Sequence, residues 1–147
     1  FVRALVQRVS RGAVKVDDEI VGQIGHGLVI LLGVSHDDGS EEVNFVADKC
    51  VNLRIFEDDA GKMNRSLLEV GGEALVISQF TLYGDCRKGR RPGFNDAALP
   101  EHAIPLYEEF IARVEKSGVK AATGIFGASM QVEIINEGPV TLLVESK

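Results

Sequence analysis

The chain has no tryptophan, only two tyrosines and only two cysteines among its 147 residues. The cysteines, Cys50 and Cys86, are too few for a disulfide framework and fit a reducing cytosol, although the sequence leaves one bridge between them open. The longest apolar run covers residues 27–34, far short of the roughly 20 residues that a membrane span requires. The first residues also lack the apolar core and cleavage site of a secretory signal. We therefore expect a cytoplasmic protein that does not bind membranes.

Positive charge is also in short supply. The 16 Lys and Arg residues are outnumbered by 22 Asp and Glu residues, which gives a net charge of −6. A general DNA-binding protein carries a basic surface, so this balance argues against DNA as a partner. Hydrophobic residues make up 45% of the chain and charged residues 26%, a balance that excludes intrinsic disorder. At this length we expect a single domain that spans residues 1–147.

Hydrophobic periodicity predicts more strands than helices. Apolar residues at three- and four-residue spacing predict one helix capped by Ser40 and a second helix. Pro100 or Pro105 suits the first turn of the second helix, and Lys116 and Gly118 end it. Cys50 falls on the apolar stripe of the first helix, so we interpret it as a core thiol. The fold class expected is α/β: one domain with a mixed, mostly antiparallel sheet, barrel-like or two-layered, covered by two main helices. Alternating or continuous apolar segments predict strands at residues 2–9, 12–16, 19–24, 27–34, 53–56, 73–82, 130–135 and 140–144, with residues 119–127 irregular.

The residue types that most often carry chemistry are not arranged in recognised motifs. No histidine stands at ligand spacing from another histidine or a cysteine, so we expect no metal site. A Ser–His–Asp arrangement stays open because triads are not local in sequence, but no G-x-S-x-G elbow supports one. Cys86 lies beside Arg87 and Lys88, yet an incidental loop thiol is favoured over a nucleophile. The histidines in question are His26, His36 and His102.

The segment Ser78–Leu82 ends a predicted strand just before a long polar loop. Side chains at such a strand end face a mouth built by loops, where sites usually lie. Ser78 and Thr81 supply hydroxyls and Gln79 an amide, which could bind an ester carbonyl or a hydroxyl. Composition alone favours a plain polar strand edge.

Two further segments stand out. Asn136–Thr141 contains Gly138 and Pro139, which predict a turn between two strands, and a Gly–Pro bond can be cis. A plain hairpin connection is the alternative. The second segment is basic at four of its five residues in an otherwise acidic chain, which indicates a phosphate or RNA contact; the alternative is a solvated loop. Its sequence is Arg87-Lys88-Gly89-Arg90-Arg91.

These segments together resemble the D-aminoacyl-tRNA deacylase family, also called the D-tyrosyl-tRNA deacylase family. The resemblance covers essentially the whole chain and includes RALVQRV at residues 3–9, SQFTLYGDCRKGRRPGF at 78–94 and TGIFGASMQVEIINEGPVT at 123–141. The family's two signature motifs, SQFTL and NxGPVT, are both present without substitution. Two rare motifs in the same order make this resemblance specific.

The resemblance implies hydrolysis of the ester that joins a D-amino acid to the 3′ end of tRNA, and also of glycine mischarged on alanine tRNA. It implies D-aminoacyl-tRNA as partner, a homodimer in which the Gly–Pro pair enters the other subunit's site, and neither cofactor nor metal. The residues carried over are Thr81 and Gln79 as catalytic; Ser78, Phe80, Gly138, Pro139, Arg8, Phe126 and Met130 as substrate-binding; and Arg87, Lys88, Arg90 and Arg91 as tRNA-binding.

The mechanism is more open than the activity. Thr81 is one candidate nucleophile, but the sequence places no activating base beside it. A substrate-assisted route, in which the ribose 2′-OH activates water and amide groups polarise the carbonyl, is favoured. Two other functions compete: a non-catalytic RNA-binding module and a hydrolase of small-molecule esters.

Overall fold

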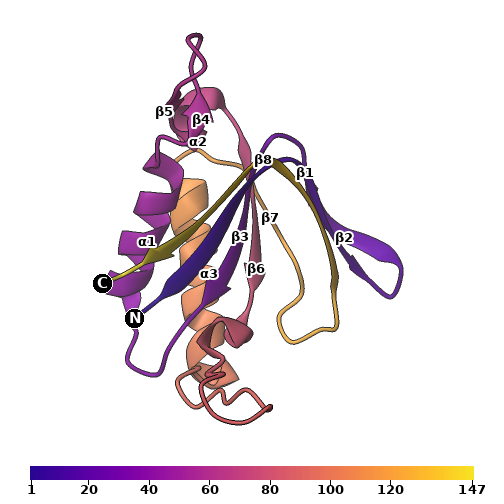
Figure 1. Cartoon of the computed structure of the whole chain (residues 1–147), viewed down its shortest axis with the longest axis vertical. Coiled ribbons are helices and arrows are strands. Elements are labelled where there is room, and N and C mark those ends of the chain that lie inside the picture. The colour runs from indigo at the N-terminus through magenta and orange to yellow at the C-terminus, as the bar shows by residue number, and fades with distance from the viewer.

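A strongly bent six-stranded sheet organises the computed structural model, which describes residues 1–147 (Figure 1). Its strand order is β2-β1-β3-β6-β7, and β8 pairs with the other edge of β1. A small separate hairpin is formed by β4 (Phe56–Glu57) and β5 (Met63–Arg65). The sheet strands are β1 (Arg3–Val16), β2 (Glu19–Ile24), β3 (Gly27–Gly33), β6 (Glu73–Ser78), β7 (Ala121–Thr123) and β8 (Gln131–Glu145). The helices are α1 (Ser40–Asn52), α2 (Leu67–Val70), α3 (Pro100–Lys116) and the 3-10 turn η1 (Phe80–Tyr83).

The long strand β1 lets the sheet curl into a nearly closed barrel. Its first half pairs with β3 and its second half with β2. At the far end, a Cβ added to Gly22 on β2 would lie 2.3 Å from the carbonyl oxygen of Thr123 on β7, so the two ends approach closely. The pairings of β3 with β6 and of β6 with β7 are parallel, and the others are antiparallel. The expected mixed, mostly antiparallel sheet is therefore confirmed.

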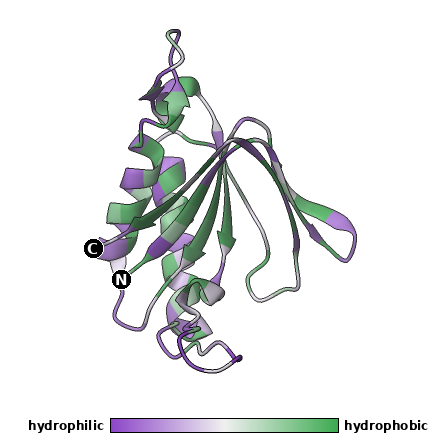
Figure 2. Cartoon of the chain, viewed as in Figure 1, coloured by the Kyte–Doolittle hydropathy of each residue, from purple (hydrophilic) through white to green (hydrophobic).

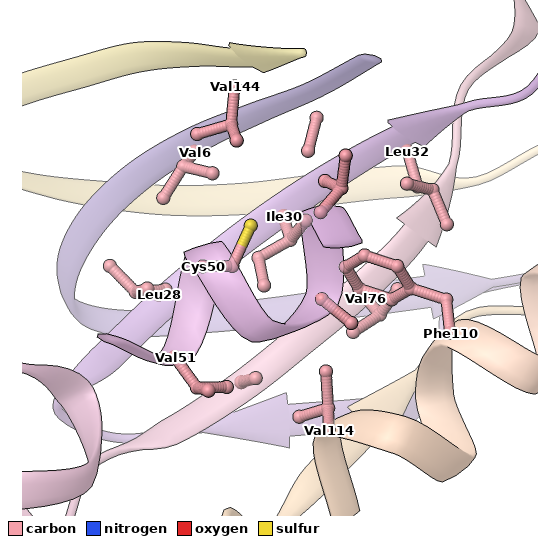
Figure 3. Close-up of a cluster of buried hydrophobic side chains, with 14 of the residues drawn as sticks. Val6, Leu28, Ile30, Leu32, Cys50, Val51, Val76, Phe110, Val114 and Val144 are labelled. Carbon is pink, nitrogen blue, oxygen red and sulfur yellow. The ribbon is translucent and has the colours of Figure 1, made fainter. Parts of the chain in front are cut away.

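Two helices cover one face of this sheet and form the main core with it. Figure 3 shows Cys50 of α1 and Phe110 of α3 packed against strand residues such as Val6. Cys50 is fully buried and free, and burial raises the pKa of its thiol to about 12, as expected of a core thiol. In Figure 2 the central strands of the sheet are mainly coloured hydrophobic, and the loops at the lower end carry much of the hydrophilic colour. None of the helices is both long and apolar enough to cross a membrane.

Several predicted boundaries are wrong. Residues 2–9 and 12–16 form one strand, and Gly39 rather than Ser40 caps α1. The short strand expected at 53–56 begins only at Phe56, where β4 finds its partner β5. Residues 119–127 include β7, which is only three residues long and partly buried, so it carries little periodicity.

The predicted turn at residues 136–141 is also wrong, because β8 does not reverse direction there. Both of its halves pair with β1: Asn136 lies opposite Val9, and Thr141 lies opposite Gln7. Five steps along β8 thus match two steps along β1, and the surplus residues project from the sheet as a bulge. Below, "the Gly138–Pro139 bulge" means residues 137–140.

Candidate active site

A cavity of about 300 Å³ opens where β3 and β6 end. The predicted strand over 73–82 stops at Ser78. The Gln79 N–H makes a last bond to the Leu32 carbonyl of β3, and the chain then turns into η1. This turn places Ser78, Gln79 and Phe80 in the cavity wall. The opposite wall comes from α3 and from the segment before β8, with Phe126 and Met130 among its residues. The structure therefore brings these five predicted site residues together.

Thr81 does not line the cavity, although the sequence predicts it as catalytic. The residue is exposed, and its hydroxyl accepts a hydrogen bond from the side-chain amide of Gln79. No carboxylate or imidazole hydrogen-bonds to Thr81, so nothing beside it can remove its proton. Its position suits a residue that orients the Gln79 amide.

The cavity wall holds almost no acid–base chemistry. Its 15 residues include no Asp, Glu, His, Cys, Lys or Arg, and 11 of them are hydrophobic. The one titratable group is Tyr107, whose hydroxyl donates to the Val76 carbonyl at 2.7 Å. Burial raises the pKa of Tyr107 to about 12, so the phenol stays protonated at neutral pH. A reaction in this cavity that needs a base would have to draw it from the bound molecule or from solvent.

Sequence reasoning missed Tyr107 and Ala103 as cavity residues. Both lie on the buried stripe of α3, which looks like ordinary core periodicity. No signal in the sequence distinguishes the turn of this helix that faces the cavity from the turns that face the sheet.

The Gly138–Pro139 bulge lies elsewhere on the molecule. Arg8, which is only 6% exposed, holds it: Nε donates to the Glu137 carbonyl at 3.1 Å, and a terminal nitrogen donates to the Ile55 carbonyl at 2.8 Å. The Gly138–Pro139 peptide bond is cis, as the sequence suggests, and both residues are exposed. The bulge is thus anchored at its base and open at its tip.

Within one chain the bulge does not reach the cavity. Arg8 pairs with Leu28 at one end of β3, whereas Ser78 pairs with Leu32 at the other end. Leu28 and Leu32 are four residues apart along β3, which corresponds to about 13 Å. One chain therefore does not assemble Gly138 and Pro139 with Ser78 into a single site.

The four basic residues predicted to bind tRNA are all exposed on the loop that follows η1. This loop adjoins the cavity through Phe94, whose ring packs edge-on against Phe80 at 5.2 Å between ring centres. Arg87 is paired with Asp85, whereas the remaining cations form no ion pair. These are Lys88, Arg90 and Arg91.

Comparison with known proteins gives a consistent picture. The family model described as D-Tyr-tRNA(Tyr) deacylase matches residues 5–145. A D-aminoacyl-tRNA deacylase of Desulfatibacillum aliphaticivorans is 62% identical over 146 residues, which cover 99% of this chain and 100% of the relative. A D-aminoacyl-tRNA deacylase of Clostridioides difficile (strain 630) is 59% identical over 145 residues, 99% of this chain and 97% of the relative.

Two solved structures share the fold. One, described as c-Myc DNA Unwinding Element Binding Protein, has a TM-score of 0.92 and 40% identity, and the match covers 99% of each chain. The other, described as a probable eukaryotic D-amino acid tRNA deacylase, has a TM-score of 0.86 at 20% identity, with 98% of each chain covered. With the matched family model and the close relatives, these findings show that the chain belongs to the D-Tyr-tRNA(Tyr) deacylase family.

Proposed function

We propose that this protein hydrolyses the ester bond of D-aminoacyl-tRNA and releases the free D-amino acid and tRNA. The observation that carries the proposal is the cavity beside Ser78–Thr81, whose wall offers an amide and a hydroxyl but no base. Such a wall suits a substrate that brings its own activating group. The aminoacyl ester of a ribose does so, because a free 2′-OH lies next to the ester oxygen. Family membership and the names of close relatives support the same activity.

In the proposed mechanism the ribose 2′-OH orients and activates a water molecule. The water oxygen attacks the ester carbonyl, and the bond between that carbon and the ribose 3′-oxygen breaks. The proton that the attacking water loses passes through the 2′-OH to the leaving 3′-oxygen. The Gln79 amide and neighbouring backbone N–H groups donate hydrogen bonds to the developing oxyanion. Thr81 holds the Gln79 amide in place and forms no covalent bond with the substrate.

We further propose that two copies of the chain complete each other's sites. The outer edge of β8 pairs with no strand of its own chain, and it carries the exposed apolar side chains of Ile135 and Leu143. Long, apolar sheet edges of this kind are typical surfaces for pairing with a second copy. A homodimer formed there would place the Gly138–Pro139 bulge of one copy at the other copy's cavity.

The bulge would then account for chiral selection. D- and L-amino acids carry the same side chains, so a screen that ignores side-chain identity has to be made of backbone. Gly138 has no Cβ, so its main chain can approach the substrate closely and block a Cβ on the L side. Glycine has no Cβ on either side, so we propose that glycine mischarged on alanine tRNA is also hydrolysed.

The decisive measurement is release of labelled D-tyrosine from D-Tyr-tRNA, with L-Tyr-tRNA as the control. We expect turnover of the D form and little turnover of the L form. Binding of tRNA without turnover would instead identify a non-catalytic RNA-binding module. Turnover of small esters without RNA, and none of D-Tyr-tRNA, would identify a small-molecule esterase.

A further inference from the structure

The loop after η1 is closed at its base into a defined unit. The Asp85 N–H donates to the Gly93 carbonyl at 2.7 Å, and the Gly93 N–H donates back to the Asp85 carbonyl at 2.9 Å. Gly89 at the tip has φ of +65°, a left-handed conformation that favours glycine. We call residues 85–93 the closed loop. Its cations are therefore presented from a closed turn of the chain.

Asp85 also braces the closed loop from inside. Its carboxylate accepts the Arg87 backbone N–H at 3.1 Å and two guanidinium N–H groups at 2.9 and 2.8 Å. These hydrogen bonds lower the pKa of Asp85 to about 2, so the carboxylate stays charged and paired at neutral pH. The charge of Arg87 is thus already balanced within the loop, and two of its guanidinium N–H groups are engaged there.

Two other cations face a hollow. Lys88 and Arg91 line a polar cavity of about 710 Å³, and neither forms an ion pair. Asp85 and Arg87 line it too, but these two are paired with each other. Arg90 stands between them in sequence but does not line this cavity. The same wall contains Asp96, whose carboxylate accepts no hydrogen bond, together with Tyr83 and Asn95. The cavity therefore combines two unpaired cations and one unpaired carboxylate with neutral hydrogen-bonding groups and with the Asp85–Arg87 ion pair.

The polar cavity and the proposed ester cavity are neighbours. Phe80 lines the ester cavity, and its ring contacts the ring of Phe94. Phe94 is the next residue after Gly93, and Gly93 lines the polar cavity. A nucleic-acid strand that places its terminal nucleoside in the ester cavity can pass over this aromatic pair toward Lys88 and Arg91.

We propose that the polar cavity is a subsite for the phosphodiesters that precede the terminal nucleoside of the tRNA. Lys88 and Arg91 bind the phosphates. Asp85 and Arg87 form a positioning pair that fixes the conformation of the closed loop, so that Lys88 and Arg91 face the cavity. This inference rests on the proposed function and deepens it, because it gives Lys88 and Arg91 one role and Arg87 another, and leaves Arg90 outside the subsite.

The test compares D-Tyr-tRNA with D-tyrosyl-adenosine, which carries the same ester but no phosphate. The variants Lys88→Ala and Arg91→Ala should lower the ratio of kcat/KM for the tRNA to kcat/KM for the nucleoside ester. Each should reduce the slope of log affinity against log salt by about 0.7, the value for one single-strand phosphate contact. Arg90→Ala, which removes the same charge outside the cavity, should reduce it by less than half as much.

A second pair of variants separates the positioning role of Asp85 from the effect of its negative charge. Asp85→Asn and Asp96→Asn each remove one negative charge beside the cavity, which on charge alone strengthens tRNA binding. We expect Asp96→Asn to lower KM for D-Tyr-tRNA and Asp85→Asn to raise it, with kcat changed less than KM in both.

The outcomes separate the two levels of the proposal. If the wild-type protein hydrolyses neither substrate, the proposed function fails. If it hydrolyses both but the ratio is the same in Lys88→Ala, Arg91→Ala and Arg90→Ala, the subsite is wrong. Lower KM in both aspartate variants would overturn the positioning role of Asp85.

Discussion

The two ends of strand β3 carry opposite kinds of structure. At the end beside Ser78 the surface is hollow, its walls are mostly apolar, and Tyr107 is its one titratable group. At the end beside Leu28 the Gly138–Pro139 bulge projects outward, and charged groups surround its base. The cavity and the bulge have complementary shapes, since one is hollow and the other projects. In one chain they are separated by about 13 Å along β3. This difference between the two ends is what the proposed dimer requires, because there each chain would supply the cavity of one site and the bulge of the other.

The largest effect is expected from Gly138→Ala, which changes only the projecting half. An added Cβ would lie 2.9 Å from a methyl carbon of Val140 and 3.2 Å from a guanidinium nitrogen of Arg8, at φ of +129°. Displacement of the bulge by even 1 Å costs roughly 10²-fold in rate if the bulge shapes the site. We expect a loss of that size in D-Tyr-tRNA hydrolysis. Activity within a few-fold of wild type would place the bulge outside the site.

Mixed dimers test whether the two halves come from different chains. Ala103→Phe should fill the cavity, because Ala103 is only 9% exposed in its wall. This variant and Gly138→Ala should each be nearly inactive alone. After unfolding and refolding together, random pairing makes half of the dimers mixed with one intact site each, so about a quarter of wild-type activity should return. No recovery, with mixed dimers verified by mass spectrometry, would mean that each site is built from one chain.

Local sequence patterns predicted the cavity and the elements around it better than they predicted the Gly138–Pro139 bulge. The apolar run of β3 and the stripe of α1 are periodic over many residues, so their burial follows from the sequence alone. The five cavity residues predicted by resemblance also meet in the structure. Thr81 is the exception, because a 3-10 turn rather than a strand follows Ser78 and places it outside the cavity wall.

The projecting half depends on strand register, which local patterns do not contain. Asn136, Gly138 and Pro139 are typical turn residues, and a turn is the ordinary interpretation of them. Whether the chain reverses or continues depends on which strand the following residues pair with. Residues 141–145 return to β1, more than a hundred positions away in sequence, and this makes a bulge out of an expected turn.

Thr81→Ala should have the next largest effect. It tests whether Thr81 orients the Gln79 amide or acts as a nucleophile. If Thr81 only orients the Gln79 amide, we expect a loss of about 10- to 10²-fold, the order of a weakened oxyanion contact. Loss of a true nucleophile would remove nearly all activity, by about 10⁴-fold or more. Single-turnover assays give the magnitude. A covalent aminoacyl-Thr81 adduct detected by mass spectrometry would refute the orienting role.

The smallest effect is expected from pH. The cavity should contribute no inflection between pH 5.5 and 8, because Tyr107, with a pKa raised to about 12, stays uncharged throughout that range. The cavity wall holds no other titratable side chain.

Tyr107→Phe tests this expectation directly, because it removes the phenol and keeps the ring. We expect the pH profile of D-Tyr-tRNA hydrolysis, corrected for spontaneous ester hydrolysis, to keep its shape in Tyr107→Phe, because a phenol with a pKa raised to about 12 stays protonated over the whole range. Single-turnover rates measured from pH 5.5 to 8 give the two profiles. A change of shape in Tyr107→Phe would mean that the phenol titrates in this range, and it would contradict a base drawn from the substrate or from solvent.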